Sequence, residues 1–450
     1  MSVASRNALL SKEIPQPAGL PFLGQTLNLV QDPLDYLVHN YYRHGPLYRV
    51  QMGFKSYLVL AGLDANRLLA RADGQLLESY TLFGGFARYT NNDMMLTALD
   101  GPEHRYLRKL MRYGFARSRA TDHLAAMFAV VDDHASHWQA GQKLPILEMM
   151  RRLIVDQLGI MTTSLKPEGY FDDIVYYLHV MLSTEVLLTL PKWWRRLPRF
   201  RRAEARLMQL AEEVLAWHRE YPPESSGRPR DLIDDLLSSS RPDGQPFNRN
   251  NLIHTAIGPY FAGVDTLAST MAFYLAALLR QPALLADIQA EVDEVLATTA
   301  TADSLRSLER LHAAAVETLR RYPVTPFTPR VAAEPFEFAG YEIPAGAELM
   351  FAQTVTHFLP EYYPDPYRFD INRFMDGNKN RITNVFTPFT VGAHTCLGAG
   401  LAEVQMLVTM AALLRRVEFE PLPANEPLRI WAAPLPNPGA GLTATVRRLR

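Results

Sequence analysis

Residues 389–398 read FTVGAHTCLG, and this stretch decides the fold because it contains the only cysteine of the chain, Cys396. With one Cys, no internal disulfide can form, and a zinc site built from several Cys residues is excluded. A lone thiol is usually a small buried apolar group, so its neighbours must decide whether it does chemistry. Phe389, Gly392 and Gly398 surround Cys396 in the spacing F-x-x-G-x-x-x-C-x-G, which this composition would produce by chance roughly once in seven thousand.

This spacing resembles the haem-binding loop of the cytochrome P-450 family. The resemblance implies that Cys396 is the axial iron ligand of haem b (heme b), and that Phe389, Gly392, His394 and Gly398 help to bind the cofactor. A free Cys has a pKa of about 8.5, so the metal and nearby backbone N–H groups must hold the thiolate charge. The two glycines would permit the turn and a close approach of backbone to porphyrin. A thiolate ligand favours cleavage of an O–O bond on the iron.

The rest of the chain shows mainly helical patterning, with strands towards both ends. Residues 1–30 are rich in proline and predicted to be irregular, and two strand-like runs within 47–60 predict a hairpin. From about residue 102 to 320, apolar residues recur at spacings of three and four, which predicts helices. After Pro323 short strand-like runs alternate with prolines, and a last helix over 397–416 precedes a strand-rich tail.

We therefore expect a mostly α fold with a minor β portion, organised as one domain over 1–450. The resemblance implies a cytochrome P-450 fold, which has a helix-rich core and small N- and C-terminal-side sheets around a buried haem, with no flavin or ferredoxin domain. A net charge of −1 gives no reason to expect a nucleic acid partner. The N-terminus lacks the apolar core of a signal peptide, so we expect a cytoplasmic protein.

An acid and an alcohol follow one another in Ala262-Gly-Val-Asp265-Thr266. Such a pair can carry protons from water into a pocket of low dielectric constant. The segment resembles the family motif on the helix that passes over the haem, which implies catalytic roles for Asp265 and Thr266. Pro259 lies upstream in the same predicted helix and should bend it. The alternative is a polar pair on a buried helix without a role in catalysis.

Four residues occupy the positions that bind haem propionates in the family: His104, Arg108, His394 and Arg330. His104 and Arg108 lie one turn apart, on one face of a predicted helix. Desolvated carboxylates need donors or cations as partners, so this set suits two propionates. Each of the four, taken alone, is also typical of a solvated surface residue.

Glu317-Thr-Leu-Arg320 matches the E-x-x-R motif of the family. By resemblance this pair joins Arg373 and fixes the segment that carries the Cys loop, which is a role in folding and not in catalysis. The alternative is an ordinary surface pair at i and i+3.

By resemblance, four segments should surround the substrate: 82–96, 258–266, 324–328 and 435–438. They contain mostly Phe, Leu, Met, Tyr and Pro, which predicts an apolar substrate such as a terpenoid, a sterol or a long-chain fatty acid. Arg88 is the conspicuous charge among them, and we expect it to face water and not a substrate carboxylate.

Two further clusters leave open alternatives. Arg105, Lys109 and Arg112 form a basic helix face, which is either merely solvated or a docking surface for an acidic electron donor. Trp193 and Trp194 stand among basic residues, which is typical of a peripheral membrane contact, but we favour the alternative that they belong to a lid over the substrate entrance.

The resemblance implies a haem-dependent monooxygenase that inserts one oxygen atom from dioxygen into a hydrophobic substrate. Electrons would come from NAD(P)H through a ferredoxin or flavodoxin and its reductase. A peroxide-driven peroxygenase or an isomerase on the same fold is the first alternative, and Asp265 with Thr266 argues against it. A haem-binding ligand carrier or sensor is the alternative from another class.

Overall fold

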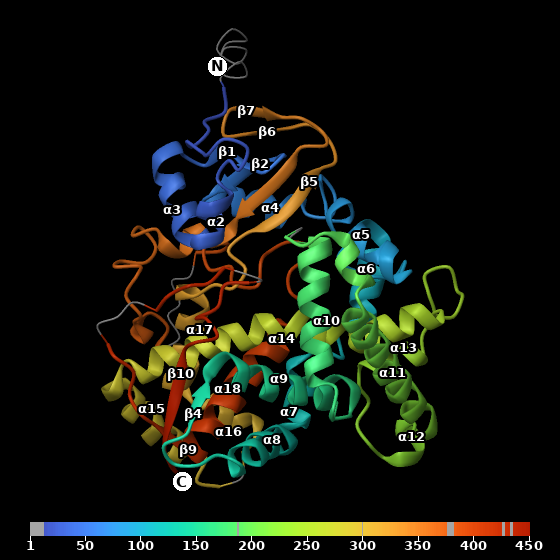
Figure 1. The fold of residues 1–450 in the computed structure, drawn as a ribbon, viewed down its shortest axis with the longest axis vertical. Coiled ribbons are helices and arrows are strands. Elements are labelled where there is room, and N and C mark those ends of the chain that lie inside the picture. The colour runs from blue at the N-terminus through green and yellow to red at the C-terminus, as the bar shows by residue number, and fades with distance from the viewer. Residues whose placement is uncertain (1–12, 187–188, 299, 376–381, 425–427, 433–434) are drawn as a thin grey trace.

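The computed structural model describes residues 13–450, apart from 187–188, 299, 376–381, 425–427 and 433–434. Helices dominate the lower part of the molecule in Figure 1, and the largest sheet lies above them. The long α-helices are α3 (Pro33–His44), α4 (Leu63–Ala72), α5 (Tyr80–Thr90), α6 (Gly101–Met111), α8 (Leu124–Ser136), α9 (Ile146–Thr163), α10 (Phe171–Met181), α11 (Pro198–Glu220), α14 (Arg249–Leu279), α15 (Pro282–Val295), α17 (Glu309–Arg321) and α18 (Ala399–Arg416).

Short helices connect these elements. The short α-helices are α2 (Thr26–Gln31), α7 (Arg117–Asp122), α12 (Pro223–Ser226), α13 (Leu232–Leu237) and α16 (Ala302–Arg306). The other short helical turns are η1 (Leu96–Ala98), η2 (Leu182–Val186), η3 (Lys192–Arg196), η4 (Gln353–Phe358) and η5 (Ile371–Arg373).

Three small sheets accompany the helices. They have the strand orders β1-β2-β8-β5-β3, β4-β10-β9 and β6-β7. The strands are β1 (Leu47–Met52), β2 (Lys55–Ala61), β3 (Leu77–Glu78), β4 (Lys143–Pro145), β5 (Thr328–Ala332), β6 (Phe336–Phe338), β7 (Tyr341–Ile343), β8 (Glu348–Ala352), β9 (Val417–Phe419) and β10 (Thr443–Leu449). The predicted mostly α fold with a minor β portion is confirmed, and so is the hairpin, since β1 and β2 pair antiparallel.

Some boundaries differ from the sequence-based expectations. Residues 1–12 of the expected irregular segment 1–30 lie outside the described residues. Its last residues, from Thr26 on, form the helix α2 and are not irregular. Strand β4 interrupts the stretch that we predicted to be helical, because it pairs with β10 from the far end of the chain. The last helix, α18, starts at Ala399 with Gly398 as its N-cap, two residues after the expected start.

Helix α14 crosses the centre of the helical part and packs along α9 (Figure 1). Its N-terminus is fixed by a capping box between Asn248 and Asn251. The helix continues through Pro259, which has no N–H to donate to the preceding turn. Among the described residues it is the one helix long and apolar enough to cross a membrane, but 83% of its most apolar window is buried inside the fold. We therefore describe α14 as a core helix.

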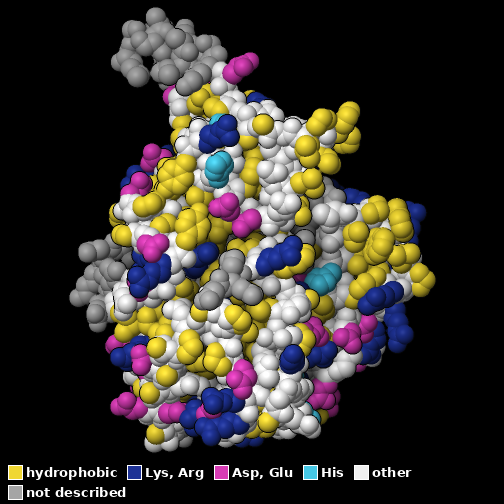
Figure 2. Space-filling model, turned by 60° about the vertical axis from the view of Figure 1, so that its left-hand side comes forward, with side chains coloured by type: hydrophobic (Ala, Val, Ile, Leu, Met, Phe, Trp, Pro, Cys, Tyr) yellow, Lys and Arg dark blue, Asp and Glu magenta, His cyan; other side chains and the backbone are white. Residues whose placement is uncertain are grey.

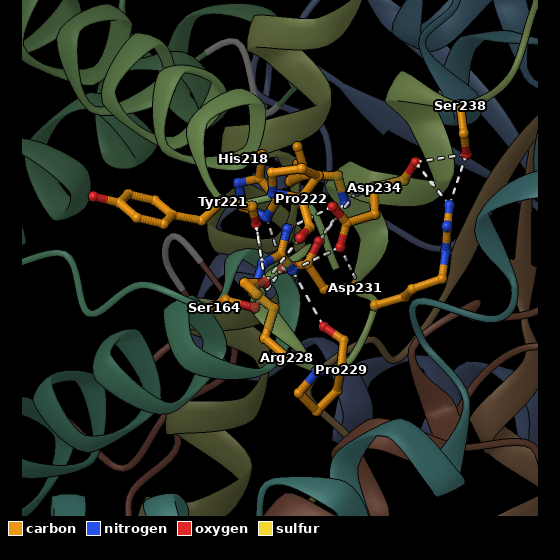
Figure 3. Close-up of polar contacts among 12 residues, drawn as sticks. Ser164, His218, Tyr221, Pro222, Arg228, Pro229, Asp231, Asp234 and Ser238 are labelled. Atoms are coloured by element: carbon orange, nitrogen blue, oxygen red, sulfur yellow. Dashed lines mark hydrogen bonds and ion pairs between the residues drawn. The ribbon is translucent and has the colours of Figure 1, made fainter. Parts of the chain in front are cut away.

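Buried charges join α11 to the start of α13 (Figure 3). Asp231 accepts a hydrogen bond from Ser164, and its carboxylate lies 2.8 Å from His218 Nε2. Arg228 pairs with Asp234 through two hydrogen bonds of 2.6 and 2.7 Å. Asp231 and Asp234 also form the capping box of α13, so these carboxylates already have protein partners. The cluster therefore explains the packing of two helices and needs no metal ion.

The face shown in Figure 2 carries side chains of both charge signs.

Glu317 and Arg320 on α17 form a fully buried ion pair, so the alternative of an ordinary surface pair is wrong. Arg320 Nε and Nη2 donate to the two carboxylate oxygens at 2.7 and 2.8 Å. Glu317 also accepts from the backbone N–H of Asp370, and Arg373 Nε lies 3.6 Å from its Oε1. The structure thus confirms that the pair contacts Arg373.

The same pair is connected to the Cys loop through His357. Arg320 Nη1 donates to the carbonyl oxygen of His357 at 2.9 Å. Burial lowers the pKa of His357 to about 3, so this ring is uncharged, and its Nε2 accepts the backbone N–H of Thr387 at 2.8 Å. Thr387 stands two residues before Phe389, where the Cys loop begins.

We predict that Glu317→Ala prevents accumulation of folded, haem-loaded protein. Removing one partner leaves the Arg320 charge buried and unpaired, which typically costs about 3–5 kcal/mol. Haem content per protein and thermal unfolding measure the effect. Asp64→Ala is the matched control, because Asp64 pairs with Arg67 at the same i,i+3 spacing on the exposed surface and should contribute less than about 1 kcal/mol. Normal yield and stability of Glu317→Ala would show that the buried pair does not hold the fold.

Candidate active site

A cavity of about 420 Å³ lies between α14 and the Cys loop. Cys396 and Phe389 line it from the loop, and Thr266 lines it from α14. Helix α6 adds His104 and Arg108. The structure thus places the sole thiol, the predicted catalytic alcohol and three of the predicted propionate partners, His394 being the third, around one space.

The Cys396 side chain is exposed, and it lines this cavity. Its backbone N–H donates to the carbonyl oxygen of Phe389 at 3.0 Å, which closes the loop. Burial raises the pKa of the Cys396 thiol, while the Gly398 N–H and the charge of Arg108 act in the opposite direction. The protein alone therefore favours a neutral thiol, and a metal ion bound to sulfur would supply the missing positive charge.

Gly392 is required where the Cys loop packs against α4. Its φ is +92°, and a Cβ there would lie 2.7 Å from Asp73 Cβ and 2.8 Å from the carbonyl oxygen of Leu69. Any other residue would be strained and would also displace the loop. At Gly398, by contrast, the nearest protein atom to a built Cβ is 3.8 Å away, so the protein itself leaves room there.

His104 carries an unsatisfied polar atom at this cavity. Its side chain is buried, and its Nε2 has no hydrogen-bond partner. Burial lowers the pKa of His104 to about 4, and its ring stacks on that of His394 at a centroid distance of 4.0 Å. A buried nitrogen without a partner typically costs about 1–3 kcal/mol, so a group from outside the chain is the expected partner. This ring nitrogen, Arg108 and the Cys396 thiol together suit a cofactor with acidic substituents and a metal centre.

His394 and Arg330 have a protein partner that the sequence did not reveal, Asp73. Arg330 Nε donates to Asp73 Oδ1 at 2.7 Å, and the His394 backbone N–H donates to Asp73 Oδ2 at 2.8 Å. Burial alone would raise the pKa of Asp73, but the hydrogen bonds from His394 and Arg330 hold it well below its usual value. His394 lines the cavity, whereas Arg330 is not among its lining residues. The propionate roles of these two residues remain predictions.

Asp265 and Thr266 point to different surroundings although they are adjacent. The Thr266 hydroxyl donates to the carbonyl oxygen of Ala262 at 2.8 Å and lines the cavity. The buried Asp265 carboxylate accepts from Arg151 Nε at 2.9 Å and lies 3.2 Å from His179 Nε2. Burial would raise the pKa of Asp265, but these two partners outweigh it and the pKa is lowered.

Beyond these partners lies a second, outer cavity of about 670 Å³. Arg151 and His179 line it, together with Arg280 and Arg429. The His179 side chain is 35% exposed and that of Asp265 only 5%, so exposure to solvent increases from the carboxylate outwards. Asp265 thus lies between the outer cavity and Thr266.

Sequence reasoning missed Arg151 and His179, and no local signal marks them, since Arg151 is 114 residues from Asp265.

Three of the four predicted substrate segments contribute to the cavity. They supply, among others, Phe86, Met94, Pro259, Phe261 and Val324. The prediction for 435–438 was wrong, because Asn437 and Pro438 line the outer cavity instead. Arg88 is exposed and is not a lining residue, as expected. The sequence had not indicated the contributions of α10 and α11, which are Tyr177, Leu178 and Leu207.

A family model described as Cytochrome P450 matches residues 14–441. The chain belongs to the cytochrome P450 family. Cytochromes P450 carry a haem-thiolate cofactor, and the thiol, the unsatisfied His104 nitrogen and Arg108 match that requirement. The enzyme is therefore an oxidoreductase of the monooxygenase class.

Named relatives support this assignment. The chain is 27% identical to cyclooctat-9-en-7-ol 5-monooxygenase of Streptomyces melanosporofaciens, over 91% of this chain and 90% of the relative. It is 28% identical to a sterol 14alpha-demethylase of Mycolicibacterium vanbaalenii, over 82% and 83%. A solved structure of retinoic acid-bound cyanobacterial CYP120A1 has a TM-score of 0.82 at 24% identity, covering 97% of this chain and 99% of that chain. At that identity the likeness supports the fold alone.

Proposed function

We propose that this cytochrome P450 inserts one oxygen atom from dioxygen into a hydrophobic terpenoid or sterol. The observation that carries the proposal is the position of Asp265 between the outer cavity and Thr266, because reduction of dioxygen consumes protons that must enter a largely apolar pocket. Relatives named for a cyclooctatenol and for sterols support these substrate classes over long-chain fatty acids.

The chain's own residues have the following roles in this proposal. Haem bound through Cys396 supplies dioxygen activation, and His104 and Arg108 hold its acidic groups. His179 Nε2 lies 3.2 Å from Asp265 Oδ2 and lines the outer cavity, so it connects the carboxylate with water there. Asp265 passes a proton to a water molecule beside Thr266 Oγ1. The Thr266 hydroxyl orients the oxygen species that accepts this proton. The stacked rings of Phe86 and Phe261, 4.6 Å apart, keep other water away from the substrate.

The electron donor in this proposal is a ferredoxin or flavodoxin, itself reduced by NAD(P)H through a reductase. Arg105, Lys109 and Arg112 are exposed on and just after α6, the helix that carries His104. Arg117 pairs with Glu403 of α18, the helix that follows the Cys loop. The basic surface therefore lies near the thiolate side, where an acidic donor would be steered by charge.

We propose a cytoplasmic enzyme with a peripheral membrane contact at η3. Trp193 is 54% exposed beside basic side chains, while Trp194 packs against the core. The packing of Trp194 against the core therefore suits a lid, whereas the exposure of Trp193 suits a membrane contact.

A peroxygenase, an isomerase and a ligand carrier remain the alternatives, and replacing Thr266 by Ala tests them. We expect Thr266→Ala to retain haem binding, iron reduction and substrate affinity. NAD(P)H oxidation should continue, but product per electron should fall, by up to about 10²–10⁴-fold, and hydrogen peroxide should accumulate. Thr270→Ala is the matched control, because Thr270 also lines the cavity one turn along α14.

Wild-type coupling of NAD(P)H to product in Thr266→Ala would contradict the monooxygenase proposal. So would a wild type that turns over with peroxide and not with electrons and dioxygen. A carrier or sensor would show no turnover in either assay.

The membrane contact has its own test. We predict that the wild type sediments with anionic liposomes and that Trp193→Ser abolishes this while substrate affinity is unchanged. Trp194→Ser should instead change substrate affinity, since that ring packs inside. If the wild type does not sediment, the membrane contact is wrong and the lid interpretation holds for both residues.

A further inference from the structure

Asp73 joins the Cys loop to a helix from the other end of the chain. It is the C-cap residue of α4, and its side chain is fully buried. Asp73 Oδ2 accepts the backbone N–H of His394 at 2.8 Å and lies 3.1 Å from Nδ1 of the same residue. His394 precedes Cys396 by two residues. Asp73 therefore holds the loop at a point next to the predicted iron ligand.

Two glycines bring the backbones of α4 and the Cys loop together at this contact. A Cβ built at Gly392 would lie 2.9 Å from Asp73 Oδ2, and one built at Gly74 would lie 3.3 Å from the Cβ of Ala393. With so little space, a short acid can reach the loop N–H directly. The contact thus fixes backbone to backbone and does not depend on a long, adaptable side chain.

Arg330 balances the charge of Asp73. Its Nε donates to Asp73 Oδ1 at 2.7 Å, and its Nη2 donates to Asp73 Oδ2 at 3.3 Å. Its Nη1 donates to the carbonyl oxygen of Pro329 at 2.8 Å. The Arg330 side chain is 3% exposed, so both members of this ion pair are removed from solvent and each needs the other. The carboxylate is therefore held in one orientation towards the loop.

The His394 ring has protein partners at both nitrogens. Its Nδ1 faces Asp73, while its Nε2 lies 3.0 Å from the carbonyl oxygen of Leu99 and 3.3 Å from Asp100 Oδ1. Leu99 and Asp100 directly precede α6, so the ring connects α4, the Cys loop and the start of α6. A ring whose two nitrogens are both engaged has no donor left for an acidic group of a cofactor. The Nε2 atom of His104, by contrast, has no partner.

We propose that Asp73 is a positioning residue of the reaction centre, which through His394 fixes the Cys loop, and with it the Cys396 thiolate, on α4. In this arrangement His394 and Arg330 serve the loop, and the acidic groups of the haem are left to His104 and Arg108. The resemblance implied propionate contacts for all four, whereas here the set is divided between two tasks. The inference goes beyond the proposed function, because it concerns the iron ligand and not the substrate.

Asp73→Asn in the holoprotein tests this role, since it keeps the size of the side chain and removes its charge. Haem content per protein is measured together with the red-shifted Soret band of the reduced carbon monoxide complex, which reports thiolate ligation. Losing a charge-assisted hydrogen bond shifts an equilibrium by about 10-fold. We therefore expect the ratio of thiolate-ligated haem to other haem to fall by about 10-fold, at a haem content close to that of the wild type.

A second variant removes the buried charge that Asp73→Asn leaves unpaired. Asp73→Asn combined with Arg330→Gln has neither member of the ion pair, so it tests the position of the loop without a buried, uncompensated guanidinium. We expect this double variant to fold at least as well as Asp73→Asn and to show a loss of the red-shifted band of the same size.

Asp231→Asn is the matched control. Asp231 is also buried, also lies at hydrogen-bond distance from a histidine, His218, and is also near an arginine, Arg228, but these partners lie outside the Cys loop. This variant should lower thermal stability and leave the fraction of thiolate-ligated haem unchanged. Arg108→Ala is the reference for a lost propionate contact. It should speed haem transfer from the holoprotein to apomyoglobin about 10-fold and keep the red-shifted band in the haem that remains.

Four results would overturn the positioning role. The first is a wild-type fraction of the red-shifted band in both Asp73→Asn and the double variant. The second is an equal loss in Asp231→Asn, because the effect would then be one of general stability. The third is faster haem transfer from Asp73→Asn without loss of the band, which would return His394 and Arg330 to the propionates. The fourth is absence of the band from the haem-loaded wild type, which would also remove Cys396 as the ligand. Turnover assays decide the proposed function separately.

Discussion

The buried ion pair between Glu317 and Arg320 is the interaction on which the remaining structure depends. Two charges without solvent are stable only when every donor and acceptor is satisfied. Arg320 meets this condition by donating to Glu317 and to the carbonyl oxygens of His357 and Pro366. His357 then accepts the N–H of Thr387, next to the Cys loop. The position of the Cys396 thiol therefore depends on charges in another helix. This dependence explains why Glu317 and Arg320, which have no catalytic role, are fully buried.

Helix α14 turns this fixed loop into a reaction site. One face of the helix carries Gly258, Ala262 and Thr266, so the cavity runs along a single rigid element. Asp265 points away from that face towards Arg151 and His179. A single buried carboxylate can thus connect the outer cavity with the pocket without admitting bulk water, because its partners and not solvent hold its charge.

Local patterns were sufficient to predict the hairpin, whereas the role of the Cys loop and of the Glu317–Arg320 pair followed from the resemblance of short motifs to a family. Such features depend on residues that are close together in the chain, where covalent geometry allows few backbone conformations. Contacts between distant segments could not be predicted this way. Asp73 meets the Cys loop across 321 residues, and the sequence around it shows no motif. The wrong prediction for 435–438 has the same origin, since a loop without regular structure is placed by tertiary packing alone.

The central claim is that Cys396 is a thiolate ligand of haem iron. The most direct measurement is the absorption spectrum of the reduced carbon monoxide complex, recorded for the wild type and for Cys396→Ser. The account predicts a strongly red-shifted Soret band in the wild type, because a thiolate donates electron density to the iron, and its loss in Cys396→Ser even where haem is retained. A red-shifted band that persists in Cys396→Ser, or its absence from the haem-loaded wild type, would contradict the account.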